Sequence, residues 1–159
     1  MIILQNLILT LCLYTYPFLN PFLPNVKVNQ STHDFTTCAK IAVAQTGVIY
    51  VTYNVEVGWI PPESTHIYLN VSLDGGSTFE PERMIEQYKK YYEIRDLTVD
   101  KNERLHLVYG QSANGADYNL YYASSTDSGQ SFPLRTQVDD NSAPLGIGLA
   151  DIAVDDSGN

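Results

Sequence analysis

The chain has 159 residues, and its 18 acidic side chains outnumber its 9 basic ones, for a net charge of -9. This acidic balance argues against a nucleic-acid partner, because binding to phosphates needs clustered Lys and Arg. Hydrophobic residues make up 44% of the chain and charged residues 17%, a composition that can bury a core and argues against global disorder.

The first 24 residues differ from the rest. Residues 1–23 carry no charge, an apolar run typical of a secretory signal peptide or a short anchor. No Lys or Arg precedes the run, Gln5 and Asn6 interrupt it, and the prolines in it would break a spanning helix, so an irregular strand or a wrongly chosen start codon is the alternative. Residues 1–24 therefore predict a secreted or cell-surface protein, with membrane contact only if they form an uncleaved anchor.

A first repeat consists of an apolar strand, a tight turn and a second strand. Its copies lie at residues 41–53, 97–109 and 152–159, and Val43, Val99 and Val154 occupy the same place in each. The turns hold Gly, Asn, Asp and Ser, the residues that hairpin turns favour. The third copy is predicted to contribute its first strand.

A second repeat lies between the copies of the first. Residues 72–79 match residues 125–132, and similar strands precede them at 67–69 and 120–122. Short fourth strands are predicted near 83–85 and 135–138. The complete unit is a four-stranded meander with a period of roughly fifty residues, which is typical of β-propeller blades.

The predicted fold is all-β, a β-propeller built of four-stranded antiparallel meander blades. Residues 25–159 would form a partial propeller, with blade one at about 38–87, blade two at about 93–138 and the start of blade three at 149–159. Closed propellers have about four to eight blades, so we expect this chain to be a fragment of a longer protein.

Residues 72–79 and 125–132 both fit the pattern Ser-x-Asp-x-Gly-x-(Ser/Thr)-(Trp/Phe). The chain from residue 25 to 159 thereby resembles the sialidase superfamily and its Asp-box (BNR) repeat relatives. The resemblance implies Asp-box turns on the face of the propeller opposite the active site. The residues with a structural role in these turns would be Ser72, Asp74, Gly76, Thr78, Phe79, Ser125, Asp127, Gly129, Ser131 and Phe132.

The chemistry of the box favours a structural role for its aspartates over a catalytic one. A carboxylate in a tight turn accepts hydrogen bonds from nearby backbone N–H groups. Gly76 and Gly129 permit a positive φ. Phe79 and Phe132 are expected to pack under the turns as apolar plugs.

The resemblance also implies what a sialidase would need: arginines that clamp the substrate carboxylate, a Tyr–Glu nucleophile pair and an Asp acid/base. The first arginine is expected just before Ile41, where the sequence instead has Thr-Cys-Ala-Lys at 37–40. Arg95 lies two residues before Leu97, where the second copy of the repeat begins, but this position does not coincide with that of the arginine in the family motif. The visible chain is therefore predicted to lack the sialidase signature, and its catalytic residues are unknown.

The face opposite the Asp-boxes offers candidate ligand contacts. Glu56, Trp59 and Glu63 lie in the loop after the second strand, and Arg95 completes the candidate set. An aromatic ring beside carboxylates suits sugar binding, although Trp59 as a cap on the blade core is the alternative. Cys38 is expected to be a small buried residue. The scattered histidines predict no metal site, and no cofactor is expected.

Three hypotheses follow. The favoured one is a secreted Asp-box propeller that binds a glycan or an extracellular protein. The second is part of an exo-sialidase-like glycoside hydrolase whose remaining catalytic residues lie beyond Asn159. The third is a structural propeller without a small ligand.

Overall fold

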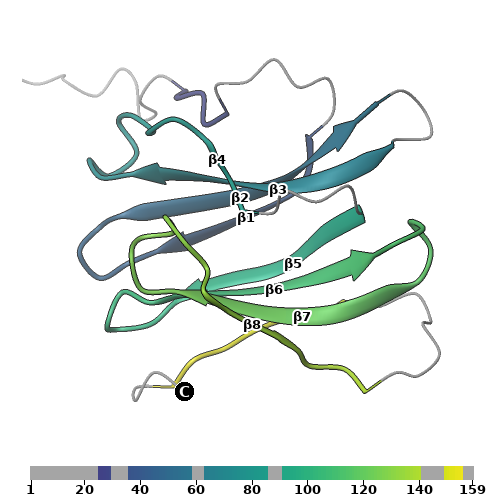
Figure 1. The fold of residues 1–159 in the computed structure, drawn as a ribbon. Helices are drawn as coiled ribbons and strands as arrows, with labels where there is room; N and C mark the ends of the chain where they lie inside the picture. The colour runs from purple at the N-terminus through teal and green to yellow at the C-terminus, as the bar shows by residue number, and fades with distance from the viewer. Residues whose placement is uncertain (1–24, 30–35, 59–62, 86–90, 141–148, 156–159) are drawn as a thin grey trace, which may run out of the picture.

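The computed structural model describes residues 25–29, 36–58, 63–85, 91–140 and 149–155, which form two four-stranded antiparallel sheets and no helix (Figure 1). The first sheet holds β1 (Thr36–Val43), β2 (Ile49–Val57), β3 (Ser64–Ser72) and β4 (Arg83–Met84), paired in that order. The second sheet repeats this order with β5 (Tyr91–Val99), β6 (Leu105–Ser112), β7 (Tyr118–Ser125) and β8 (Leu134–Gln137). The all-β class and the four-stranded antiparallel meanders predicted from the two repeats are confirmed.

The hairpins form where the turn chemistry predicted them. Gly47 has a φ of 89° and donates its N–H to the carbonyl of Ala44 at 2.9 Å, which closes the β1–β2 turn. In the β5–β6 turn, Asp100 Oδ1 accepts the N–H groups of Asn102 and Arg104 at 2.8 and 2.9 Å. A carboxylate in this place satisfies turn amides that no ladder partner can reach.

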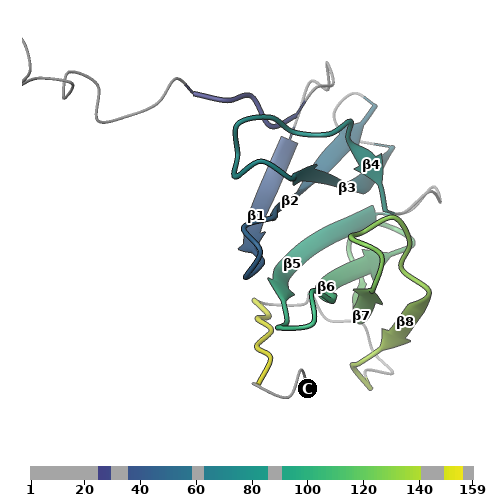
Figure 2. The same ribbon diagram turned by 90° about the vertical axis from the view of Figure 1, so that its left-hand side faces the viewer.

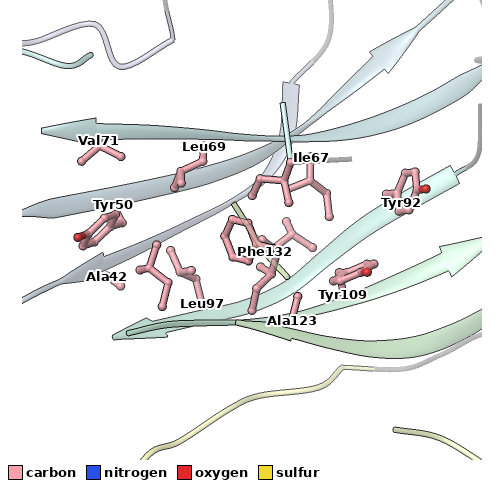
Figure 3. Packing of buried hydrophobic residues seen from close by; sticks show 14 of the residues in the cluster. Ala42, Tyr50, Ile67, Leu69, Val71, Tyr92, Leu97, Tyr109, Ala123 and Phe132 are labelled. Carbon is pink, nitrogen blue, oxygen red and sulfur yellow. The ribbon is translucent and has the colours of Figure 1, made fainter. Parts of the chain in front are cut away.

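The two sheets stack face to face, and the contact between β1 and β5 brings their first strands side by side (Figure 2). A single apolar core fills the space between them (Figure 3). β2 and β3 place Tyr50, Ile67, Leu69 and Val71 in it, and the second sheet and its last loop add Tyr92, Leu97, Leu105, Leu107, Tyr109, Ala123 and Phe132. Each fully buried aliphatic or aromatic side chain of this kind contributes about 1.5–3 kcal/mol to folding.

The loop between β7 and β8 packs against the first sheet and is hydrogen-bonded to it. Gly129 packs so closely on β3 that a Cβ at this position would lie 2.1 Å from Cδ2 of Leu69. From the first sheet, Arg83 donates Nη1 to the carbonyl of Ser128 at 3.1 Å. In the opposite direction, Arg135 of the second sheet donates Nη2 to the carbonyl of Ile85 at 3.2 Å.

His106 is buried on the side of β6 that faces away from this core. Its Nδ1 lies 2.8 Å from the Tyr122 hydroxyl and its Nε2 lies 3.3 Å from Asp100 Oδ2. Burial tends to raise the pKa of Asp100, but hydrogen bonds from Arg104, His106 and Asn102 outweigh it and lower the pKa. Through these two contacts His106 connects Tyr122 of β7 to Asp100 in the β5–β6 turn.

Two expectations differ from the structure. Cys38 is exposed, so the prediction of a small buried residue is wrong; it lies where the β1–β2 register shifts between Thr37 and Lys40, and its φ of 53° turns it out of the ladder. Residues 149–155, predicted to begin the third copy of the repeat, are not a strand in the structure and belong to neither sheet. They instead run past β5, where Asp96 Oδ2 accepts the N–H of Ile152 at 3.0 Å. Residues 156–159, the rest of the third repeat, lie outside the described residues.

The contact of Gly129 with Leu69 predicts a large cost for Gly129→Ala. The new methyl group would strain a backbone at φ 77° by about 1–2 kcal/mol and overpack a fully buried leucine by about 1–3 kcal/mol. We expect urea unfolding to give a loss of about 2–5 kcal/mol in the free energy of unfolding.

Gly75→Ala is the matched control, because Gly75 has a φ of 68° and a Cβ there would meet no atom within 4 Å. Only the backbone cost of about 1–2 kcal/mol should remain. Equal losses in the two variants would show that the packing of Gly129 on β3 contributes nothing.

Candidate functional site

A cleft of about 380 Å³ opens between the two sheets, at the end opposite the loops that follow β3 and β7. Its lining comes from the ends of β1, β2, β3, β5 and β7 and from the β6–β7 loop. The lining combines tyrosine rings, carboxylates, amides and hydroxyls: Thr37, Cys38, Asn54, Glu56, Thr65, Tyr91, Tyr92, Glu93, Asn114, Gly115 and Tyr118. Such a mixture suits a polar ligand that has some apolar surface.

The wall between the sheets is held by side chains of the first sheet on the free edge of β5. Asn54 donates Nδ2 to the carbonyl of Tyr92 at 2.7 Å, and its Oδ1 accepts the N–H of Ile94 at 3.0 Å. Thr65 pairs through its hydroxyl with both the carbonyl and the N–H of Tyr92 at 2.6 Å. These bonds satisfy backbone groups that β6 cannot reach, and they fix the width of the cleft.

The acidic side of the cleft is built at a β-bulge. The β5–β6 register shifts between Ile94 and Asp96, and Arg95 lies within this shift. Arg95 donates Nη1 and Nη2 to the two carboxylate oxygens of Glu93, each at 3.0 Å, in a planar fork. Burial, followed by the neighbouring Glu93 carboxylate, raises the pKa of Tyr118.

The β6–β7 loop supplies the remaining wall, and Asn114 organises it. Its Oδ1 accepts the N–H groups of Ala116 and Asp117 at 2.9 and 3.0 Å. Its Nδ2 donates to the Asp117 carboxylate at 2.7 Å. Next to it, the ring of Tyr91 faces Gly115, where a Cβ would lie 3.3 Å from the ring carbons.

The four candidate ligand contacts predicted from the sequence fall in different places. Glu56 lines the cleft. Arg95 does not line the cleft but bonds to Glu93, which does. Glu63 is exposed beyond the end of β2, does not line the cleft and donates its N–H to the carbonyl of Val57 at 2.8 Å. Trp59 lies outside the described residues.

Sequence reasoning missed Glu93, Asn114 and the lining tyrosines. A signal for Tyr118 was present: aligning strand 120–122 with 67–69 places Tyr118 opposite Thr65 in the repeat, so both occupy the same end of a third strand. Asn114 and Glu93 carry no comparable pattern, since their roles depend on a loop conformation and on a bulge.

The turn at residues 72–79 is closed by side chains that bond to backbone groups and to one another. Asp74 Oδ1 accepts from the Ser72 hydroxyl and the Thr78 N–H, both at 2.8 Å, and Oδ2 accepts from the Thr78 hydroxyl at 2.7 Å. The Ser72 hydroxyl in turn accepts the N–H of Gly76 at 2.8 Å. The bonds from Thr78 and then Ser72 lower the pKa of Asp74 to about 2. Phe79, the last residue of this stretch, is half-buried.

The turn at residues 125–132 has the same pattern of hydrogen bonds as the turn at residues 72–79. Asp127 Oδ1 accepts from the Ser125 hydroxyl at 2.7 Å and the Ser131 N–H at 2.9 Å, and Oδ2 accepts from the Ser131 hydroxyl at 2.5 Å. The Ser125 hydroxyl accepts the N–H of Gly129 at 2.9 Å. Burial tends to raise the pKa of Asp127, but these hydrogen bonds lower it to about 2. Phe132 beneath this turn is buried in the core.

The described residues offer little for a metal or for an acidic substrate. They contain no group of three or more His, Cys, Asp or Glu side chains placed to hold a metal ion. None of the described residues that line the cleft is basic. The part of the chain described by the structure likewise contains no helix long and apolar enough to cross a membrane.

Comparisons with known proteins show a likeness in fold. No family model and no curated protein matches the sequence. Among solved structures, a Hadza microbial sialidase superposes with a TM-score of 0.51 and 12% identity, over 64% of this chain and 24% of that protein. A protein of unknown function from Dyadobacter fermentans gives a TM-score of 0.48 and 16% identity, over 61% of this chain and 26% of that protein.

The described chain is therefore an all-β protein with a sialidase-like fold. At this identity the likeness concerns the fold alone. The chain spans about a quarter of the length of the two structures it matches.

The low pKa of Asp127 predicts a loss of stability in acid. A folded-state pKa of about 2, below the ordinary value of 3.8, gives stability that is present above pH 4 and lost as the pH falls toward 2. In Asp127→Asn that loss should shrink, because the titrating group is gone. Melting temperatures between pH 2 and pH 6 measure it.

Asp140→Asn, the same change at an exposed carboxylate, is the matched control and should keep the acid slope of the unmodified chain. A slope left unchanged by Asp127→Asn would mean that the box carboxylate does not stabilise the turn through its charge.

Asn54→Ala should loosen the edge of β5. The N–H of Ile94 would lose its partner in a buried place, a cost of about 1–3 kcal/mol. Hydrogen exchange followed by NMR should show faster exchange of the Ile94 amide than in the unmodified chain. The amide of Leu107, which lies in the β5–β6 ladder opposite Leu97, is the internal control, and equal acceleration of both amides would contradict a local role for Asn54.

Proposed function

We propose that this chain is part of a secreted β-propeller that binds a glycan in the cleft between its two sheets. The observation that carries the proposal is the cleft itself, in which Tyr91 and Tyr118 lie beside the carboxylates of Glu56 and Glu93. A tyrosine ring can stack on the apolar face of a sugar, while acids and amides bond to its hydroxyls.

The propeller arrangement is part of the same proposal. Its supports are the identical strand order of the two sheets, the register shift that both first strands share, and the packing of the Gly129 turn on the preceding sheet. A surface of this kind could also take an extracellular protein. The proposal of secretion rests on the uncharged leader at residues 1–24.

Glycan binding is favoured over glycoside hydrolysis because of the charges at the cleft. A sialidase needs a basic fork for the carboxylate of its substrate. Of the four described arginines, Arg95 holds Glu93, Arg83 binds Glu80 and the Ser128 carbonyl, and Arg135 bonds to a backbone carbonyl. The fourth, Arg104, is exposed next to the β5–β6 turn and does not line the cleft. Turnover of a fluorogenic sialoside by the full chain would overturn the proposal in favour of the hydrolase.

A glycan array tests binding directly, and Tyr91→Ala tests the cleft. Because a stacked ring contributes about 0.5–1.5 kcal/mol, the Kd for the best glycan should rise roughly threefold to tenfold. Tyr68→Ala is the matched control: Tyr68 is also half-buried, but it stacks on Tyr53 at a centroid distance of 6.1 Å and does not line the cleft. With both variants folded by circular dichroism, an equal loss of binding in both would place the ligand elsewhere.

A further inference from the structure

Arg95 binds the carboxylate of Glu93 in the way that an arginine would bind the carboxylate of a ligand. Both carboxylate oxygens of Glu93 meet the two terminal nitrogens of Arg95 at 3.0 Å, the geometry in which a guanidinium would bind a ligand carboxylate. The side chain of Arg95 is only 11% exposed, whereas that of Glu93 is 34% exposed and lines the cleft. The acid therefore lies between the arginine and any ligand.

The surroundings strengthen the acidic character of the cleft. Glu56 adds a second carboxylate to the lining, and no described lining residue is basic. The other ionisable groups that line it are the phenols of Tyr91, Tyr92 and Tyr118 and the Cys38 thiol. An anionic sugar would meet Glu56, which has no basic neighbour among the described lining residues, and would find the fork of Arg95 already occupied. Like charges brought together in this way oppose binding.

We infer that the Glu93–Arg95 pair makes the cleft selective for uncharged glycans and excludes sugars that carry a carboxylate, sialic acids among them. This inference rests on the glycan-binding function proposed above. Glu93 acts as the specificity-determining residue, because it both faces the ligand and holds Arg95. Arg95 acts as a positioning residue that fixes the Glu93 carboxylate.

The test uses pairs of glycans that differ by one terminal sialic acid, such as lactose and sialyllactose, first on an array and then by calorimetry with the full chain. The neutral member of a pair should bind at least roughly tenfold more tightly than the sialylated one. Glu93→Ala should reduce this preference roughly tenfold, because the acid is removed and the fork of Arg95 faces the cleft. Glu93→Gln removes the charge with little change in shape, and it should reduce the preference in the same direction.

Glu80→Ala is the matched control. Glu80 also pairs with an arginine, Arg83, and is similarly exposed, but it lies outside the cleft. This variant removes the same charge and should leave the preference unchanged. In the double variant Glu93→Ala/Arg95→Ala, any affinity gained for the sialylated glycan should disappear.

The outcomes separate the two proposals. Tighter binding of the sialylated member by the unmodified chain would overturn the selectivity and leave glycan binding standing. An unchanged preference in both Glu93 variants, with circular dichroism spectra like those of the unmodified chain, would also overturn it. Binding of no glycan on the array would overturn the glycan-binding function, and the selectivity with it.

Discussion

The free edge of β5 is buried against the first sheet, and its backbone groups need partners that no strand supplies. A buried N–H or C=O without a partner costs as much as a lost hydrogen bond. Asn54 and Thr65 meet this need from the other sheet, by bonding to the backbone of Tyr92 and Ile94. Since one amide reaches two residues of β5, the bonds fix both the spacing and the rotation of the sheets. The cleft follows from this constraint, because its walls continue from the same strand ends.

Much of the fold could be predicted from the sequence, because repeated patterns of apolar residues and turn residues are local signals. The strand predicted at 67–69 falls within β3, and the short strand predicted near 83–85 overlaps β4. Cys38 was misjudged because the expectation rested on the residue type alone, whereas its exposure depends on the register shift in β1, which no local pattern marks. The region around Ile152 shows the other limit, since an apolar sequence becomes a strand only beside a partner.

The site was less predictable than the fold, because it depends on contacts between repeats. The sequence placed Glu56 in the loop after the second strand, whereas it lies near the end of β2, where it lines the cleft. The pairing of Arg95 with Glu93 could not be predicted, since it depends on the bulge at residue 95. Asn54 follows directly after the first repeat at residues 41–53, and its role as a bridge between the sheets appears only when β5 lies beside it.

Carboxylates serve two physical purposes in this chain, and their surroundings separate them. Asp74 and Asp127 accept several hydrogen bonds within their own turns, which holds their pKa at about 2 and leaves them charged and occupied. Glu56 and Glu93 line an open cleft instead, where a carboxylate can meet a ligand. The likeness to a sialidase concerns the fold alone, and the proposed binding of a glycan depends on the charges of the side chains that line the cleft. Arg95 is held by Glu93 of its own strand, so the described lining of the cleft offers no arginine fork to an acidic ligand.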